Sequence, residues 1–297
     1  MEKHRKKLIK NAAVFDGHSS GLAHGKKIVI EDDLVTEITG DEVSEENFGE
    51  VFDGTGMVAM PGMTDAHVHM GCLFAKGEFP VDYATVLTVA KCKDALMAGF
   101  TTFRDAGSVS EGLKLAFDEG VLPGPRIYPC GAYISQTCGH GDSEYAHTYR
   151  DIQYRHPSST VLVDGVPEII RAVREQFYRG ASHIKLMATE ILNRHEDIRL
   201  LFGTDMMITG PDYQVEQSED IRYYEKRFGT MRALRALTGT ANEVFALTTY
   251  QNPYPKGKIG VLEAGSYADL LLVDGDPTKS VLVLADTDHL RLIMKGG

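Results

Sequence analysis

The stretch that decides how this chain is interpreted reads Pro61-Gly62-Met63-Thr64-Asp65-Ala66-His67-Val68-His69. Small and apolar residues dominate it, as in a buried strand, and two histidines close it. Side chains of a strand alternate between its two faces, so His67 and His69 are expected to point the same way. Imidazole is a common ligand for zinc and similar divalent ions, and this spacing therefore indicates a metal site. Two histidines also fall at this spacing by chance, so the motif alone leaves both interpretations open.

Composition limits the classes of protein to consider. The chain has 297 residues, of which 43% are hydrophobic and 25% charged, and its formal net charge is −11. Such a balance is typical of a globular protein with a sizeable core, and it argues against a nucleic-acid-binding surface. No apolar run approaches the roughly 20 residues of a membrane span, and no signal-peptide core follows the basic start. The four cysteines show no Cys-x-x-Cys spacing, so we expect reduced thiols. Together these features predict a cytoplasmic protein that has neither nucleic acid nor a membrane as a partner.

Both ends of the chain have β character. Residues 27–30 and 34–38 are strand-like runs on either side of a polar turn, which predicts a hairpin. Near the other end, residues 257–262 and 269–273 are separated by the turn-forming Glu263-Ala264-Gly265-Ser266. We predict one small β domain built from residues 1–57 and 257–297.

The middle of the chain alternates between helical and strand patterns. Apolar residues at 169, 170, 173 and 177 make one helical face between Pro167 and Gly180, and a predicted strand at 182–187 follows. A second helical stretch ends at Gly99 and leads into a predicted strand at 100–105. This order predicts parallel βαβ units, in which chemistry gathers at the carboxyl ends of the strands. His67, His69, Asp105 and Lys185 fall at such ends.

Five motifs occur in an order that resembles the amidohydrolase superfamily, and more narrowly its imidazolonepropionase-like and prolidase-like branch. They are Pro61 to His69, Gly99-Phe100-Thr101-Thr102-Phe103-Arg104-Asp105-Ala106-Gly107, Gly139-His140-Gly141-Asp142, Ile184-Lys185-Leu186-Met187-Ala188-Thr189 and Phe202-Gly203-Thr204-Asp205. The tail from Gly257 to Pro277 is similar to the segment that rejoins the N-terminal strands in that family.

The resemblance implies a fold and a metal site. The fold is an α/β (βα)8 barrel at residues 58–256, with a small β-sandwich formed by both termini. His67 and His69 match metal ligands after the first strand, Lys185 matches a lysine that carbon dioxide converts to a bridging carboxylate, and Asp205 matches the aspartate after the eighth strand. The site would hold one or two divalent ions such as zinc, and Asp205 would act as the catalytic acid and base. Taken singly, Lys185 could also be a plain buried lysine and Asp205 a turn residue.

The resemblance also gives His140 a role. In similar enzymes the loop that holds it faces the substrate, so His140 is a candidate substrate-binding residue that donates to an amide or carboxylate oxygen. A solvated histidine in a glycine-rich turn is equally compatible with the sequence. Asp105 is expected to have a structural role. His147, His156, His183 and His289 are expected either to lie at the surface or to be buried in the core with hydrogen-bond partners.

The chain departs from the family pattern between two of the motifs. Four βα units span about 120 residues in a barrel of about 250, yet positions 185 and 205 are only 20 residues apart. Barrel strands 5 to 7, with two further histidine ligands, are therefore expected to be absent, and His195 in this interval is interpreted as a surface residue. We predict an incomplete barrel whose exposed edges favour a homo-oligomer.

Two functions remain open at this point. The first is a metal-dependent hydrolase that cleaves a carbon–nitrogen bond in a small amide, such as a cyclic amide, an N-acyl amino acid or an Xaa-Pro dipeptide. The second is an impaired or inactive remnant that acts as a metal-binding or scaffold protein. Counting ligands predicts at most one tightly bound ion, held by His67, His69 and Asp205, and activity below that of full-length relatives.

Overall fold

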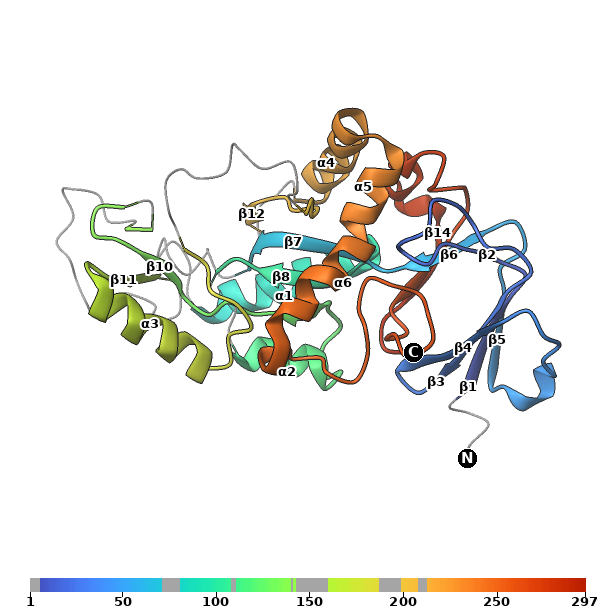
Figure 1. Cartoon of the computed structure of the whole chain (residues 1–297), viewed down its shortest axis with the longest axis horizontal. Coiled ribbons are helices and arrows are strands. Elements are labelled where there is room, and N and C mark those ends of the chain that lie inside the picture. Colours follow the sequence, from blue (N-terminus) through green and yellow to red (C-terminus); the bar gives the residue numbers. More distant parts are fainter. Residues whose placement is uncertain are drawn as a thin grey trace.

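The structure is a computed structural model that describes residues 6–70, 81–107, 111–139, 141–142, 160–186, 199–207 and 213–297. Figure 1 shows a β-rich unit at one end of the molecule, and a sheet covered by helices beside it.

The first sheet of the β-rich unit is formed entirely by the N-terminal region. It contains β1 (Lys6–Lys10), β3 (Lys27–Glu31), β4 (Leu34–Thr39) and β5 (Glu50–Asp53), in the order β4-β3-β1-β5. The predicted hairpin is confirmed, because β3 and β4 pair antiparallel around a turn in which Asp32 takes a positive φ of 54°. Ile28 and Ile30 alternate inward along β3 and are buried, as a strand with one covered face requires.

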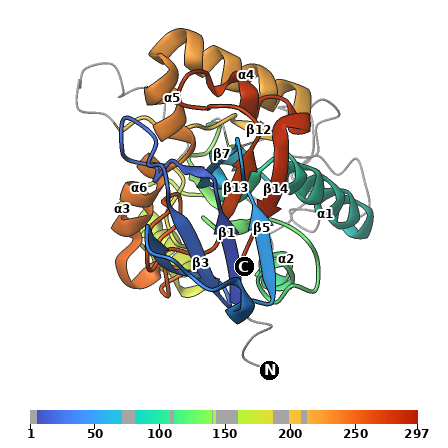
Figure 2. The same cartoon turned by 90° about the vertical axis from the view of Figure 1, so that its right-hand side faces the viewer.

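The second sheet joins the two ends of the chain. It contains β2 (Ala13–Val14), β6 (Val58–Pro61), β13 (Leu270–Val273) and β14 (Leu290–Met294), in the order β14-β13-β6-β2. β13 pairs antiparallel with β6, and the amide of Val35 donates to the carbonyl of Ser266 at 2.9 Å. Apolar side chains from both sheets form one core, which includes Ile28, Val35 and Leu270. Figure 2 shows strands from both ends of the chain side by side. The boundaries at residues 57 and 257 stay a prediction.

The predicted strand at 257–262 is wrong. This segment makes one isolated bridge, between Lys258 and Ser266. Gly260 takes a positive φ of 79°, and a Cβ there would lie 2.6 Å from the carbonyl oxygen of Thr238. The backbone therefore turns at Gly260 and packs closely against the helical region, so a regular strand cannot continue through it.

A parallel sheet lies beside the β-rich unit. It contains β12 (Met206–Met207), β7 (Met63–His69), β8 (Phe100–Asp105) and β9 (Arg126–Tyr128), in the order β12-β7-β8-β9. All three pairings are parallel, which confirms the predicted βαβ arrangement. β10 (Tyr133–Ser135) pairs in parallel with β11 (Thr160–Leu162). Within the described residues, no strand pairing joins β12 to the segment ending at Leu186, and the incomplete barrel and homo-oligomer stay predictions.

The helices follow the signals in the sequence. α1 (Val81–Met97) leads through Gly99, at a positive φ of 88°, directly into β8. α2 (Glu111–Asp118) precedes β9, and α3 (Val166–Tyr178) has Pro167 near its start and ends before Gly180 at a φ of 94°. Glycine tolerates these left-handed conformations, which explains why both helices stop where they do.

Two details of the α3 unit differ from the prediction. Ile169 and Ile170 are 39% and 44% exposed, whereas Ala172 and Gln176 are buried. Gln176 is accommodated because its Oε1 accepts from the amide of Ala132 at 2.9 Å, so a polar residue occupies the packing face. The expected strand at 182–187 is, within the described residues, reduced to one bridge between Leu186 and Ile134.

The last helices cover the parallel sheet. α4 (Tyr213–Phe228), α5 (Thr230–Leu237) and α6 (Gly239–Phe245) follow β12, and their apolar side chains join a large core that includes Phe202, Leu234 and Leu237. The described part of the chain also contains the short 3-10 helices η2 (Glu45–Asn47), η4 (Ala246–Gln251), η5 (Val281–Leu284) and η6 (Thr287–His289). Within the described ranges, none of the helices combines the length and the apolar character that a membrane crossing requires.

Candidate metal centre

Two histidines stand at the carboxyl end of β7. His67 and His69 point to the same side of the strand, as their spacing predicts, and their ring centroids are 5.4 Å apart. The His69 side chain is 10% exposed and that of His67 is 35% exposed. The histidines therefore sit at a sheet edge that is shielded but still reachable.

Asp205 reaches both histidines from the neighbouring segment. Its Oδ1 lies 2.9 Å from His67 Nε2 and 3.2 Å from His69 Nε2. The segment runs parallel to β7, and the Asp205 amide donates to the carbonyl of His67 at 2.7 Å. Asp205 has a positive φ of 55°, an uncommon conformation that aspartate tolerates better than most residues. Strand pairing thus places residues from distant parts of the sequence at one locus.

Gly203 makes this close approach possible. A Cβ at this position would lie 2.7 Å from the Cβ of His67 and 3.1 Å from its amide nitrogen. Real Cβ atoms do not approach backbone and side chains so closely, so any larger residue would push the two segments apart. The glycine two residues before Asp205 therefore serves the geometry of the site.

Asp65 fastens the two segments together and was not singled out by the sequence analysis. It is fully buried, and its Oδ1 accepts from the amides of His67 and Thr204 at 3.2 and 3.3 Å. Its Oδ2 accepts from the Thr204 hydroxyl at 2.9 Å and lies 3.5 Å from Gln217 Nε2. A carboxylate inside an otherwise apolar strand run was the available signal, because buried charges need partners.

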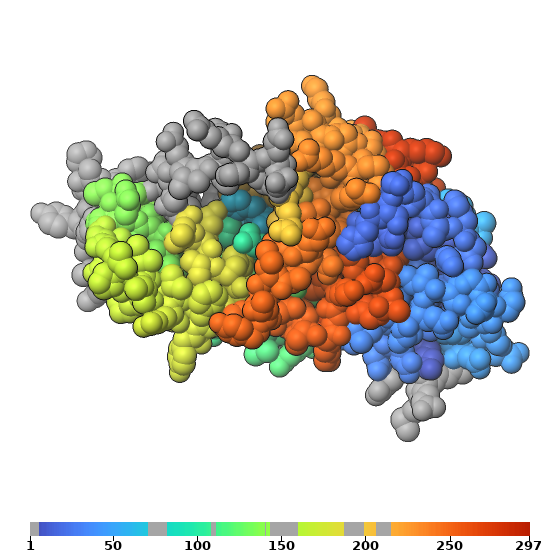
Figure 3. All heavy atoms as spheres, in the orientation of Figure 1, coloured from blue at the N-terminus to red at the C-terminus, as the bar shows by residue number. Residues whose placement is uncertain are grey.

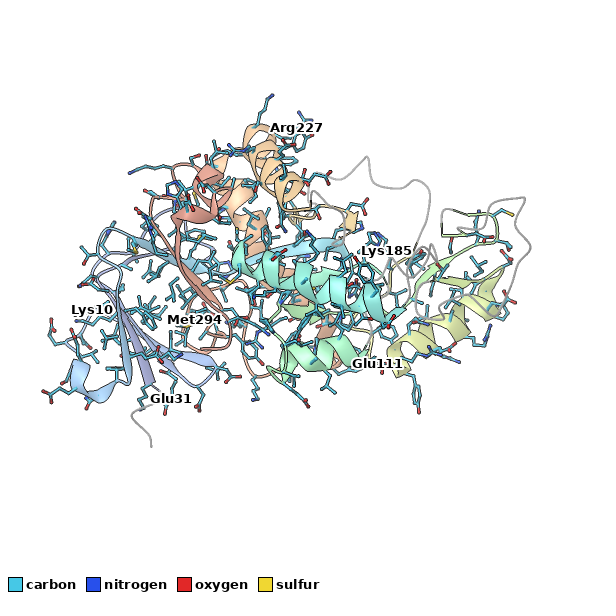
Figure 4. All side chains as sticks on the ribbon, turned by 180° about the vertical axis from the view of Figure 1, so that it is seen from behind. Lys10, Glu31, Glu111, Lys185, Arg227 and Met294 are labelled. Carbon is cyan, nitrogen blue, oxygen red and sulfur yellow. The ribbon has the colours of Figure 1, made fainter. Side chains whose placement is uncertain are left out.

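Lys185 completes the cluster. Its Nζ lies 2.8 Å from His67 Nε2, and the side chain is half-buried. Figure 4 shows Lys185 in the helix-covered part of the molecule, away from Lys10 and Met294, which belong to the β-rich unit. All four predicted metal-site residues, His67, His69, Lys185 and Asp205, are thus brought together.

Electrostatics keep the His67 imidazole neutral. Burial, reinforced by the neighbouring Lys185 ammonium, lowers the pKa of His67 to about 4, although Asp205 opposes this shift. A neutral imidazole offers the lone pair that a metal ligand needs. Near neutral pH, His67 is therefore in the form that binds a metal ion.

The other described histidines that the sequence analysis named, and Asp105, make contacts with the backbone. The amide of Met70 donates to the buried Asp105 at 3.1 Å, which agrees with the expected structural role. His183 lies with Nε2 3.1 Å from the carbonyl oxygen of Asp105, and burial lowers its pKa to about 3. His289 Nδ1 contacts the carbonyl oxygen of Asp274 at 2.6 Å. The candidate substrate-binding residue His140 lies outside the described residues, as do His147, His156 and His195.

The donor set matches what a divalent ion requires. One ligand atom each from His67, His69 and Asp205 lies within 4.8 Å of the others, and these three form the one such group among the residues that the structure describes. Zinc binds nitrogen and oxygen at about 2.0–2.2 Å, which separates neighbouring ligands in a tetrahedral site by about 3.4 Å. The distances from Asp205 Oδ1 to the Nε2 atoms of His67 and His69 are 2.9 and 3.2 Å, and small outward movements would bring both to that spacing.

Part of this chain is similar to a known protein family. Residues 58–196, which contain β7 with both histidines and also Lys185, match the family model described as "Amidohydrolase family". Just under half of the chain is therefore similar to an amidohydrolase-family domain.

Two curated proteins are similar to parts of this chain. Ochratoxinase of Aspergillus niger is 34% identical over 152 residues, which cover 44% of this chain and 31% of the relative. A 5-methylthioadenosine/S-adenosylhomocysteine deaminase of Dictyoglomus turgidum is 31% identical over 70 residues, 24% of this chain and 16% of that protein. The matched region thus spans about a third of the length of the ochratoxinase, or less for the deaminase.

Solved structures show the same fold. An amidohydrolase crystal structure has a TM-score of 0.81 at 22% identity, with 98% of both chains covered. A prolidase complexed with N-methylphosphonate-L-proline gives 0.78 at 21% identity, again with 98% of both chains covered. The A. niger ochratoxinase structure gives 0.76 at 18% identity and covers 100% of this chain and 95% of its own. These similarities support an α/β amidohydrolase-type fold.

Proposed function

We propose that this chain is a metal-dependent hydrolase that cleaves a carbon–nitrogen bond in a small amide substrate. The observation that carries the proposal is the convergence of His67, His69 and Asp205 at the carboxyl ends of parallel strands, where α/β enzymes place their chemistry. The names of the curated relatives support it, since a deaminase breaks a carbon–nitrogen bond.

The metal would be held by the two imidazoles and the Asp205 carboxylate, with zinc as the expected ion. When bound, such an ion supplies Lewis acidity that activates water near neutral pH. Lys185 lies beside His67 and would add a further ligand if carbon dioxide reacted with its unprotonated amine. In that reaction a nitrogen–carbon bond forms and the amine loses a proton, which leaves an anionic carboxylate.

Asp205 is the proposed general base and acid. Its side chain is 69% exposed, so water and substrate can reach it, whereas His69 is largely enclosed. Asp205 would accept a proton from the water that attacks the carbonyl carbon. It would then deliver that proton to the leaving nitrogen as the carbon–nitrogen bond breaks.

The proposed substrates are N-acyl amino acids and Xaa-Pro dipeptides. The prolidase among the structural neighbours and a Xaa-Pro dipeptidase at a TM-score of 0.67 and 19% identity motivate this choice. His140 stays a proposed substrate-binding residue. We also propose that the fold is an amidohydrolase barrel shortened by strands 5 to 7, with a β-sandwich built from both termini.

A non-catalytic metal-binding protein is the second candidate. The number of ligands favours it, because His67, His69 and Asp205 are the only metal-ligating group of three among the described residues. Three protein ligands plus water suffice for a catalytic zinc, and for that reason the hydrolase remains the preferred proposal.

Hydrolysis of an N-acyl amino acid and Xaa-Pro dipeptide panel by zinc-loaded protein tests the proposal. We expect turnover that a chelator abolishes and that Asp205→Asn lowers by about 10²–10⁴-fold in kcat/KM at saturating zinc. His289→Asn serves as the control, because its contact with the Asp274 carbonyl belongs to the β-rich unit. Zinc binding without turnover on the whole panel would support the second candidate instead.

A further inference from the structure

A hollow lined by arginines lies apart from the metal centre. It has a volume of about 620 Å³, is open to one side, and is lined by Arg199 and Leu200, the end of α4, the start of α5 and the start of α6. None of its lining residues belongs to the candidate metal centre. Figure 3 shows the segment around residue 200 in contact with the helical residues of the C-terminal region. The volume is typical of sites that hold a small organic molecule.

The charge of this hollow is opposite to that of the whole chain. Three arginines line it, Arg199, Arg232 and Arg235, against a single acidic residue, Glu243. Arg199 Nε already pairs with Glu243 Oε2 at 3.0 Å. Among the residues that the structure describes, no ion pair is found for the other two guanidinium groups, Arg232 and Arg235, which lie three residues apart on one face of α5 in a protein whose net charge is −11.

Arg235 shows a specific need for an acceptor. Its Nε is buried and finds no hydrogen-bond acceptor among the residues that the structure describes. A buried donor of a charged group costs free energy unless it is satisfied. Because the Arg235 side chain also lines the hollow, a small movement of the guanidinium group would turn this donor toward an anion bound there. Arg232 lies beside it with its guanidinium carbon 5.7 Å from the centre of the Phe228 ring.

The remaining wall has two properties that narrow the class of ligand. Leu200, Phe228 and Met231 supply apolar surface. α5 begins at Gly229 without a side-chain cap, so its first-turn amides add positive potential to what the arginines provide. Two arginine forks suit a dianion better than a single carboxylate.

We propose that this hollow, the arginine pocket, binds a small organic phosphate monoester, with the phosphate on Arg232 and Arg235 and the organic group on the apolar wall. The proposal does not depend on the hydrolytic function.

Calorimetric titration of the full chain with phenyl phosphate, at constant ionic strength, tests the proposal. We expect one saturable site per chain and affinity at least tenfold weaker in Arg235→Gln and in Arg232→Ala, since each change removes charge-assisted hydrogen bonds. Arg222→Ala removes an exposed arginine of α4 outside the pocket, and its affinity should equal that of the wild type.

Two further measurements separate this site from the alternatives. Binding should persist in His67→Asn, which excludes the metal centre as the phosphate site, and inorganic phosphate and benzoate should each bind more weakly than phenyl phosphate. If Arg235→Gln fails to fold, the exposed Arg232→Ala still decides the matter, with circular dichroism as the check on folding. The absence of saturable binding, or equal affinity in wild type and Arg232→Ala, would overturn the proposal.

Discussion

Replacing Asp65 by asparagine should loosen the candidate metal centre without removing any of its ligands. The carboxylate accepts from the amides of His67 and Thr204 and from the Thr204 hydroxyl, at 3.2, 3.3 and 2.9 Å. Asparagine has the same shape but one acceptor oxygen fewer, so in either orientation its NH₂ group faces a donor. Each hydrogen bond to a charged group contributes about 1.5–3 kcal/mol.

We therefore expect Asp65→Asn to lower the free energy of unfolding by about 2–4 kcal/mol and to weaken zinc binding. Urea denaturation gives the first quantity and zinc titration the second. Thr204→Val, which removes only the hydroxyl, should cost about 1 kcal/mol. Asp41→Asn changes an exposed aspartate and should stay within about 0.5 kcal/mol of the wild type. An Asp65→Asn variant as stable as this control would refute the role assigned to the carboxylate.

The remaining predictions concern close packing and a buried ion pair. Gly203→Ala should lower both the free energy of unfolding and the zinc affinity, because the added Cβ would lie 2.7 Å from the Cβ of His67. Gly21→Ala is the control, since nothing lies within 4 Å of a Cβ there, and it should change neither quantity in the same two assays. Asp269→Asn should cost about 3–5 kcal/mol in urea denaturation, because it leaves the buried Arg126, now paired at 2.6 Å, without its carboxylate. Asp274→Asn breaks an exposed ion pair and should cost less than about 1 kcal/mol, so equal losses in the two variants would contradict the burial argument.

Local patterns predicted much of the fold. The hairpin at 27–38 and the helix-to-strand steps at Gly99 and after Pro167 follow from turn chemistry and periodicity, which act over a few residues. The shared direction of His67 and His69 follows from the period of a strand. The position of Asp205 beside them came from the resemblance of motif order, since nothing local links residues so far apart.

Contacts between distant segments account for what the sequence did not reveal. The hydrogen bonds that Asp65 accepts from Thr204 join segments more than a hundred residues apart in the sequence. The need for glycine at position 203 appears only where its backbone meets that of His67. The predicted buried face of α3 was partly wrong, because Gln176 is buried in place of Ile169. Its side-chain amide oxygen accepts a hydrogen bond from the backbone amide of Ala132, which makes this burial possible. The strand expected at 257–262 gave way to a turn at Gly260, whose tight contact with Thr238 is likewise tertiary.

Zinc stoichiometry of the purified chain tests the central claim most directly. After loading and dialysis, elemental analysis should return one tightly held ion per chain, because His67, His69 and Asp205 supply one set of three ligands. His69→Asn should abolish retention, and His289→Asn should retain the ion as the wild type does. No retained zinc in the wild type, undiminished retention in His69→Asn, or two tightly held ions per chain would contradict the three-ligand centre.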